Sequence, residues 1–136
     1  MPTLPSPPSA ARCALLLLGV RLHLRARGFG PSVALARRLG RTRPPLADDA
    51  GARALADSAA RGVATAAAFF PGRAVCLEQS LALYVVLRRR GVAAELRVGV
   101  HPAPFTAHAW VEVAGEPVNE NPELIGTLLP FPALLR

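Results

Sequence analysis

The stretch from Cys76 to Arg90 constrains the fold more than any other part of this sequence. Its apolar side chains recur at helical spacing and also fill the remaining sides: Leu77, Leu81, Leu83, Tyr84, Val85, Val86 and Leu87. A helix that is apolar almost all round belongs inside its domain, where other elements cover it. Gly91 follows three arginines and is a natural terminating residue. The sequence therefore predicts a buried helix over 76–90.

Three more helices are predicted in the first half of the chain. Met1 to Ser9 has four prolines in nine residues and is expected to be disordered, and Gly40 to Pro45 is expected to be a linker. Asp48 and Asp49 are expected to cap the third helix, and Pro71-Gly72 to end it. The three helices are predicted over 10–27, 32–39 and from the two aspartates to about Phe70.

The pattern changes to strand-like alternation after Gly91. Strands are predicted over 93–100, 107–114 and 117–120, with a rigid loop at His101–Pro104 and a tight turn at Gly115-Glu116. Helices followed by an antiparallel sheet indicate an α+β fold. A chain of 136 residues is long enough for one core, so we expect a single domain over 10–136, with a helical part over 10–70 and a catalytic part over 71–136.

The charge of the chain limits its partners. The net charge is +7, and all 16 cations are arginine. Such a surface attracts anions, but the arginines are spread along the chain and aromatic residues make up only 5% of it, which argues against nucleic acid. Two explanations of the positive charge stay open at this point: a compositional bias towards arginine, and a binding site for an acidic partner.

Two features bear on the compartment. Cys13 and Cys76 form no disulfide framework or metal-binding spacing, which fits a reducing cytoplasm. The apolar run Ala14–Val20 is followed at once by Arg21 and other basic residues and is far shorter than the ~20 residues that a membrane helix needs. We therefore expect a cytoplasmic protein for which membrane association is unlikely.

Cys76 and His108 are the strongest candidates for catalysis. Cys76 opens the buried helix, where the helix dipole and free N–H groups favour a thiolate, and His108 lies in a predicted strand. Either residue alone is more often a core residue. Together their positions suggest a thiol nucleophile and its base, which is the arrangement of acyl-transfer chemistry. By strand alternation His108 shares a face with Trp110 and Glu112. The small and branched residues of the other face suit packing on the helix, which would leave His108 on the opposite side. We expect instead that the His108 face lies towards the helix, because a His at the end of a strand can reach over the start of a helix packed beneath it.

A third group should orient the imidazole. Glu120 lies twelve residues after His108 on the strand predicted to fold back beside it, so the two are expected to be cross-strand neighbours. Asn119 and Asn121 flank Glu120 and are alternatives. The backbone N–H of Cys76 and the amide of Gln79 are candidate oxyanion donors.

A zinc site is the competing interpretation of the same residue types. It would use Cys76, His101 and His108, but it lacks a fourth ligand at regular spacing, and His101 is expected in a surface loop. We expect neither a metal nor a cofactor.

Several segments together resemble the transglutaminase-like leader peptidases of lasso-peptide biosynthesis, the B processing proteins, in the form without their own precursor-recognition domain. The resemblance covers roughly residues 71 to 136 strongly and the helical first half loosely, and it rests on 76–83, 88–92, 99–100, 104–112 and 117–120. It implies a papain-like cysteine protease that removes the leader from a precursor peptide, with Cys76 as nucleophile and His108 as base. The family usually has Asp where this chain has Glu120.

The resemblance also implies partners and leaves two rival functions. The partners are the precursor peptide, a separate precursor-recognition protein and an asparagine-synthetase-like cyclase that closes the ring. Arginines of the first half would contact an acidic leader or the recognition protein. The rivals are an amine-accepting acyl transferase of the transglutaminase type and a catalytically weak scaffold that binds the leader.

Overall fold

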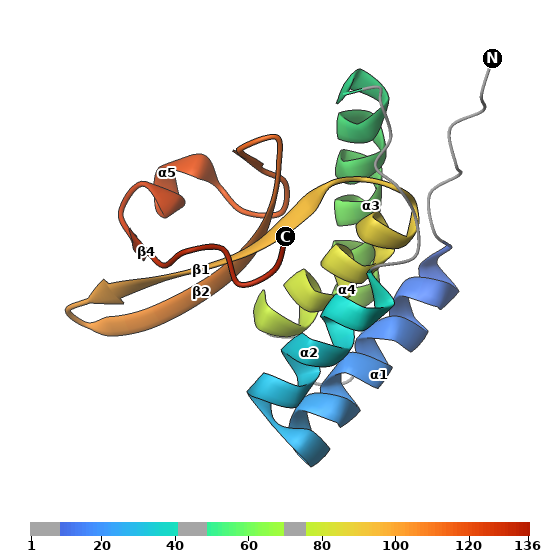
Figure 1. Ribbon diagram of the computed structural model, residues 1–136, viewed down its shortest axis with the longest axis horizontal. Coiled ribbons are helices and arrows are strands. Elements are labelled where there is room, and N and C mark those ends of the chain that lie inside the picture. Colours follow the sequence, from blue (N-terminus) through green and yellow to red (C-terminus); the bar gives the residue numbers. More distant parts are fainter. Residues whose placement is uncertain (1–8, 41–48, 70–75) are drawn as a thin grey trace.

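The computed structural model describes residues 9–40, 49–69 and 76–136 (Figure 1). Four helices come first, and a small antiparallel sheet with one short helix follows. This is the α+β arrangement that the sequence predicts. The helices are α1 (Ala10–Arg27), α2 (Phe29–Leu39), α3 (Asp49–Ala68), α4 (Cys76–Arg89) and α5 (Pro122–Ile125), and the strands are β1 (Ala94–Pro102), β2 (Phe105–Val113), β3 (Glu116–Pro117) and β4 (Leu129–Pro130).

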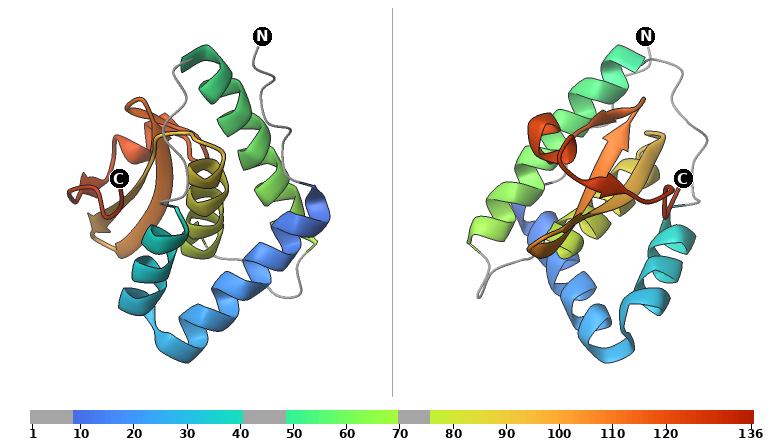
Figure 2. Two further views of the ribbon diagram at one scale, coloured as in Figure 1. Left: turned by 45° about the vertical axis from the view of Figure 1, so that its right-hand side comes forward. Right: turned by 90° about the vertical axis from the view of Figure 1, so that its left-hand side faces the viewer.

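Helix α4 lies in the centre, as its composition predicts. Helices α1, α2 and α3 cover one side of it and the sheet covers the other (Figures 1 and 2). Its side chains from Ser80 to Leu87 are all buried. Gly91 has a left-handed φ of 86°, and Val92 donates its N–H to Leu87 O, so the helix ends as expected.

The outer helices agree with the predicted ranges within a few residues. Ser9 caps α1 by accepting from the Arg12 N–H at 3.2 Å. Helix α2 begins at Phe29 instead of Ser32, because Pro31 falls in the first turn, where its missing N–H is not needed. The expected disordered leader up to Pro8, the linker over 41–45, the capping by Asp48 and the stop at Pro71-Gly72 lie outside the described residues.

The four strands are ordered β3-β2-β1-β4, all antiparallel. The expected loop at His101–Pro104 is wrong in extent. Strand β1 continues through His101 and Pro102, which pair with Thr106 and Phe105, and only Ala103 and Pro104 form the turn. Pro102 is tolerated because it lies at the last pair, where the ladder ends.

The third strand is shorter than predicted and ends at Pro117. Ala114 and Gly115 both have positive φ, as the central residues of a tight hairpin turn do, so the turn lies one residue earlier than expected. Val118 still donates its N–H to Val111 O, but the Val111 N–H is taken by the side chain of Asn119 instead of a backbone carbonyl. The side chain ends the ladder there.

The two faces of the sheet have different partners. Ala94, Leu96, Val111 and Val113 belong to the core cluster that also contains α4. A Cβ on Gly99, which pairs with His108, would lie 3.1 Å from atoms of both Trp110 and Leu128. Because paired residues share a face, His108 and Trp110 lie on the face away from the core of α4, towards Leu128 between α5 and β4. The expectation that this face looks towards the helix is wrong, since Val111 and Val113 occupy that side.

Within the described ranges, no helix combines the length and the apolarity that crossing a membrane requires. The apolar run of the first helix instead belongs to α1, where Leu17 is fully buried while Leu15 and Leu18 are exposed.

Candidate functional site

Cys76 is the first residue of α4 and is half-buried. The other cysteine, Cys13, is fully buried in the core, and this burial raises the pKa of its thiol, against a smaller opposing effect of Arg90. A buried thiol with a raised pKa is a poor nucleophile. Of the two thiols, Cys76 is therefore the one placed to react with a substrate.

Ser80 fixes the start of α4 against β2. Its hydroxyl is fully buried and donates to the carbonyl oxygen of Ala109 at 3.0 Å. Residues four apart lie on one face of a helix, so the face of α4 that carries Cys76 also looks towards β2. Ala109 directly follows His108 in the chain.

The direction of α4 places Cys76 along β2. Strand β1 starts shortly after α4, and its first residue, Ala94, pairs with Val113 at the end of β2. The helix and β2 therefore run in the same direction. Four helical residues rise about 6 Å, which is about two strand residues. Cys76 thus lies level with the part of β2 around Ala107 and His108.

Asn119 completes a buried polar clamp with Ser80. Its Nδ2 donates to Ser80 Oγ at 3.0 Å, and its Oδ1 accepts the Val111 N–H at 2.8 Å. The amide offered as an alternative partner for His108 therefore joins α4 to β2 instead. The sequence signal for this clamp was a lone serine in an apolar helix, and it was missed.

His108 and Glu120 are both half-buried. Glu120 Oε1 accepts the N–H of Asn121 at 2.9 Å. Asn121 Oδ1 in turn caps α5 by accepting the Glu123 N–H. Among the described residues, no hydrogen bond joins His108 to Cys76 or to Glu120. The expected cross-strand pairing of Glu120 with His108 is not formed, because the segment that carries Glu120 leaves β2 after Val118.

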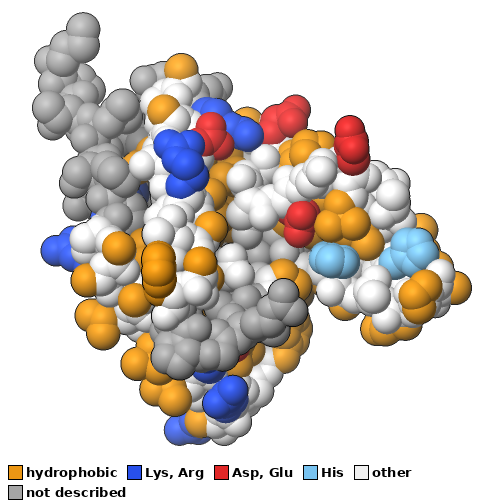
Figure 3. Space-filling model, turned by 180° about the vertical axis from the view of Figure 1, so that it is seen from behind, with side chains coloured by type: hydrophobic (Ala, Val, Ile, Leu, Met, Phe, Trp, Pro, Cys, Tyr) orange, Lys and Arg blue, Asp and Glu red, His pale blue; other side chains and the backbone are white. Residues whose placement is uncertain are grey.

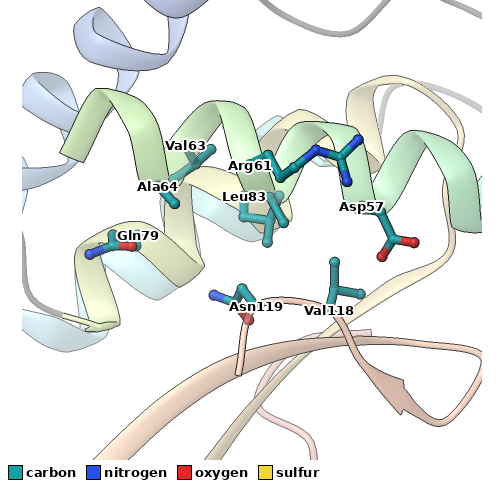
Figure 4. Close-up of a pocket in the computed structure, with 9 residues that line it drawn as sticks. Asp57, Arg61, Val63, Ala64, Gln79, Leu83, Val118 and Asn119 are labelled. Atoms are coloured by element: carbon teal, nitrogen blue, oxygen red, sulfur yellow. The ribbon is translucent and has the colours of Figure 1, made fainter. Parts of the chain in front are cut away.

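A pocket of about 290 Å³ adjoins the first turn of α4 (Figure 4). It lies between α3, α4 and the segment after β3. Both polar and apolar side chains line it. Its lining residues are Asp57, Ala60, Arg61, Val63, Ala64, Gln79, Leu83, Val118 and Asn119. Gln79, named above as an oxyanion donor, faces this pocket together with Asn119.

The structure also bears on the zinc interpretation. The described parts of the chain contain no cluster of three or more His, Cys, Asp or Glu side chains that could hold a metal ion. His101 lies within β1 opposite Thr106, not in a loop.

Two comparisons with known proteins agree with this architecture. Residues 16–131 match the profile of the transglutaminase-like superfamily. The chain is also 43% identical over 49 residues to the microcin J25-processing protein McjB of Escherichia coli, and these residues are 36% of this chain and 24% of that protein. No solved structure matches the chain. The resemblance stated from the sequence is confirmed, and the chain belongs to the transglutaminase-like superfamily.

Proposed function

We propose that this chain acts in lasso-peptide maturation as a cysteine peptidase that removes the leader from the precursor peptide. The observation that carries the proposal is the position of Cys76, at the start of a buried helix whose Ser80 is bonded to the residue after His108. The match to a microcin J25-processing protein supports the substrate class. The match covers a minor part of both chains, so the substrate and the partners remain part of the proposal.

In the proposed reaction, the His108 side chain, which lies on the face of β2 away from α4, first turns past the strand to reach Cys76. Cys76 Sγ then gives its proton to His108 and attacks the carbonyl carbon at the junction of leader and core. The imidazolium then protonates the leaving amine, and the C–N bond breaks to give a thioester. Water attacks the thioester, His108 accepts a proton from it, and Cys76 is released with a new carboxylate on the leader. Glu120 would orient the imidazole after a side-chain rearrangement. The freed core would pass to the asparagine-synthetase-like cyclase.

A cleavage assay tests this proposal. The chain is incubated with the precursor peptide and the recognition protein encoded with it, and the products are weighed by mass spectrometry. Cys76→Ala should abolish cleavage with the circular dichroism spectrum unchanged, whereas Cys13→Ala should retain it. Cleavage by Cys76→Ala would remove Cys76 from the mechanism.

Membership of the transglutaminase-like superfamily favours a second candidate, acyl transfer to an amine. The thioester would then be attacked by an amine instead of water. Adding a primary amine to the same assay distinguishes the two, because transfer adds the mass of the amine to the acyl product.

The missing contact between His108 and Glu120 favours a third candidate, a scaffold that binds the leader without cutting it. Glu120→Asp restores the usual residue of the family. A large gain in cleavage rate would identify an impaired triad, while no cleavage by either form in the presence of both partners would support the scaffold.

We further propose that an acidic leader or recognition protein binds a basic groove of about 310 Å³ between α1, α2 and α4. Leu16, Leu39, Val85 and Val86 line it together with three arginines, Arg12, Arg89 and Arg90. Arginine side chains gather over the helical part of the surface, while histidine side chains lie over the sheet (Figure 3). Binding should weaken as salt rises from low to physiological strength. Binding insensitive to salt would contradict this site.

A further inference from the structure

A buried ion pair joins α1 to the first turn of α4. The Arg21 Nε lies 3.3 Å from both carboxylate oxygens of Glu78, and its Nη2 lies 3.2 Å from Oε2. The two residues are only 8% and 9% exposed. The guanidinium therefore contacts both oxygens of the carboxylate in a charge-assisted pair.

The position of this ion pair beside Cys76 says more about its role than its contribution to stability does. A buried ion pair is weak support for stability, because apolar side chains of similar volume often serve as well. Glu78, however, lies two residues after Cys76, in the same turn of α4. Residues two apart point to nearly opposite sides of a helix, so Glu78 reaches towards α1 while Cys76 and Ser80 look towards β2.

We propose that Arg21 is a positioning residue for Cys76 that acts through Glu78: it cancels the charge of Glu78, which would otherwise oppose a thiolate at Cys76. The inference rests on the proposed role of Cys76 as nucleophile. An unpaired carboxylate in the same helical turn would slow attack by the thiol roughly fivefold, because two unit charges roughly 10 Å apart interact by ~1 kcal/mol at an effective dielectric between that of protein and water. With Arg21 in place the pair is neutral at that distance.

Other charged groups near this turn stay the same in the test. Asp57 and Arg61 of α3 line the pocket beside Gln79, His108 comes from β2, and Glu120 follows β3. Because none of them is altered, differences between the variants arise from positions 21 and 78.

The test measures alkylation of Cys76 by iodoacetamide, followed by mass spectrometry of the peptide that contains it, at pH 7 and as a profile from pH 6 to pH 9. The variants are Arg21→Gln, Glu78→Gln and the double variant, each checked for folding by circular dichroism. Arg25→Gln is the matched control, since Arg25 is exposed one turn further along the same helix and loses the same charge.

Arg21→Gln should slow alkylation about fivefold and shift its pH profile upwards, while Glu78→Gln should speed it by a similar factor and shift the profile downwards. The double variant and Arg25→Gln should stay near the unaltered chain. If Arg21→Gln does not fold, Glu78→Gln and the double variant still differ only in the charge at position 21, and the double variant should react more slowly.

A purely structural pair would behave differently. Each single variant would leave one buried charge unpaired, so both would change the rate in the same direction through a loosened turn, and that result would overturn the proposal. Equal rates for Glu78→Gln and the double variant would overturn it as well. The assay needs no peptide substrate, so a failure here is distinct from a failure of the proposed peptidase activity.

Discussion

Ser80→Ala should destabilise the chain far more than an ordinary serine substitution in a helix. The Ser80 hydroxyl donates to Ala109 O and accepts from Asn119 Nδ2, both at 3.0 Å, in a fully buried position. The substitution removes both hydrogen bonds but leaves their partners in place. The buried carbonyl of Ala109 and the half-buried amide of Asn119 would then each lose a partner.

The magnitude follows from these groups. Each unsatisfied buried group costs about 1–3 kcal/mol, and alanine returns about 0.5 kcal/mol through its better helix propensity. The free energy of unfolding should therefore fall by about 1.5–5.5 kcal/mol. For a domain of this size a loss of 1 kcal/mol lowers Tm by about 3–5 °C, so Tm should fall by roughly 5–27 °C.

Urea and thermal unfolding followed by circular dichroism at 222 nm measure this effect. Ser58→Ala is the matched control, because Ser58 is half-buried in α3 and its loss should change stability by no more than about 0.5 kcal/mol. Asn119→Ala should also destabilise, and the double variant should lose less than the sum of the two by at least about 0.5 kcal/mol, because the residues share one network. Equal effects of Ser80→Ala and Ser58→Ala, or strict additivity, would refute the clamp.

Three further results are expected. Gly99→Ala should destabilise by about 1–3 kcal/mol in urea unfolding, because its Cβ would lie 3.1 Å from atoms of Trp110 and Leu128. Burial raises the pKa of Cys13, so the thiol stays protonated when the unfolded chain ionises. Stability should therefore fall as the pH rises above about 8.5, and Cys13→Ala should flatten that fall between pH 7 and pH 10. Glu120→Gln should slow cleavage in the precursor assay at least about tenfold if it orients the imidazole, and an unchanged rate would remove it from the mechanism.

The central helix and the hairpin were predictable because hydrophobic patterns determine both. An all-round apolar segment has one place in a domain this small, and alternation over Glu95–Val100 and Ala107–Val113 leaves one face for the core. The strand ends were predicted less well. The pattern treated His101 and Pro102 as loop residues, but pairing with Thr106 and Phe105 extends the strand through them.

Which face His108 occupies could not be decided from alternation alone. The period of two groups His108 with Trp110 but does not say which group faces α4. Small Ala109 and branched Val111 are as suitable for packing against α4 as Trp110 is. Which face turns towards α4 depends on Leu128, which comes from a later segment and lies close to Trp110 on the other face. Long-range packing of this kind leaves no mark in a local pattern.

Two buried contacts hold the first turn of α4 and therefore affect the position of Cys76. Glu78 fixes one side of the turn to α1, and Ser80 fixes the opposite side to β2. The start of α4 is bonded on two sides, so it cannot shift along α1 or β2 without breaking a buried polar contact. Breaking such a contact costs free energy that the movement of an unbonded helix end does not cost. The position of Cys76 is therefore determined by two residues that touch no substrate in the proposed reaction. If Cys76 is the nucleophile, substitutions at Arg21 and Asn119 should change its reactivity without removing any group that takes part in the bond-breaking step.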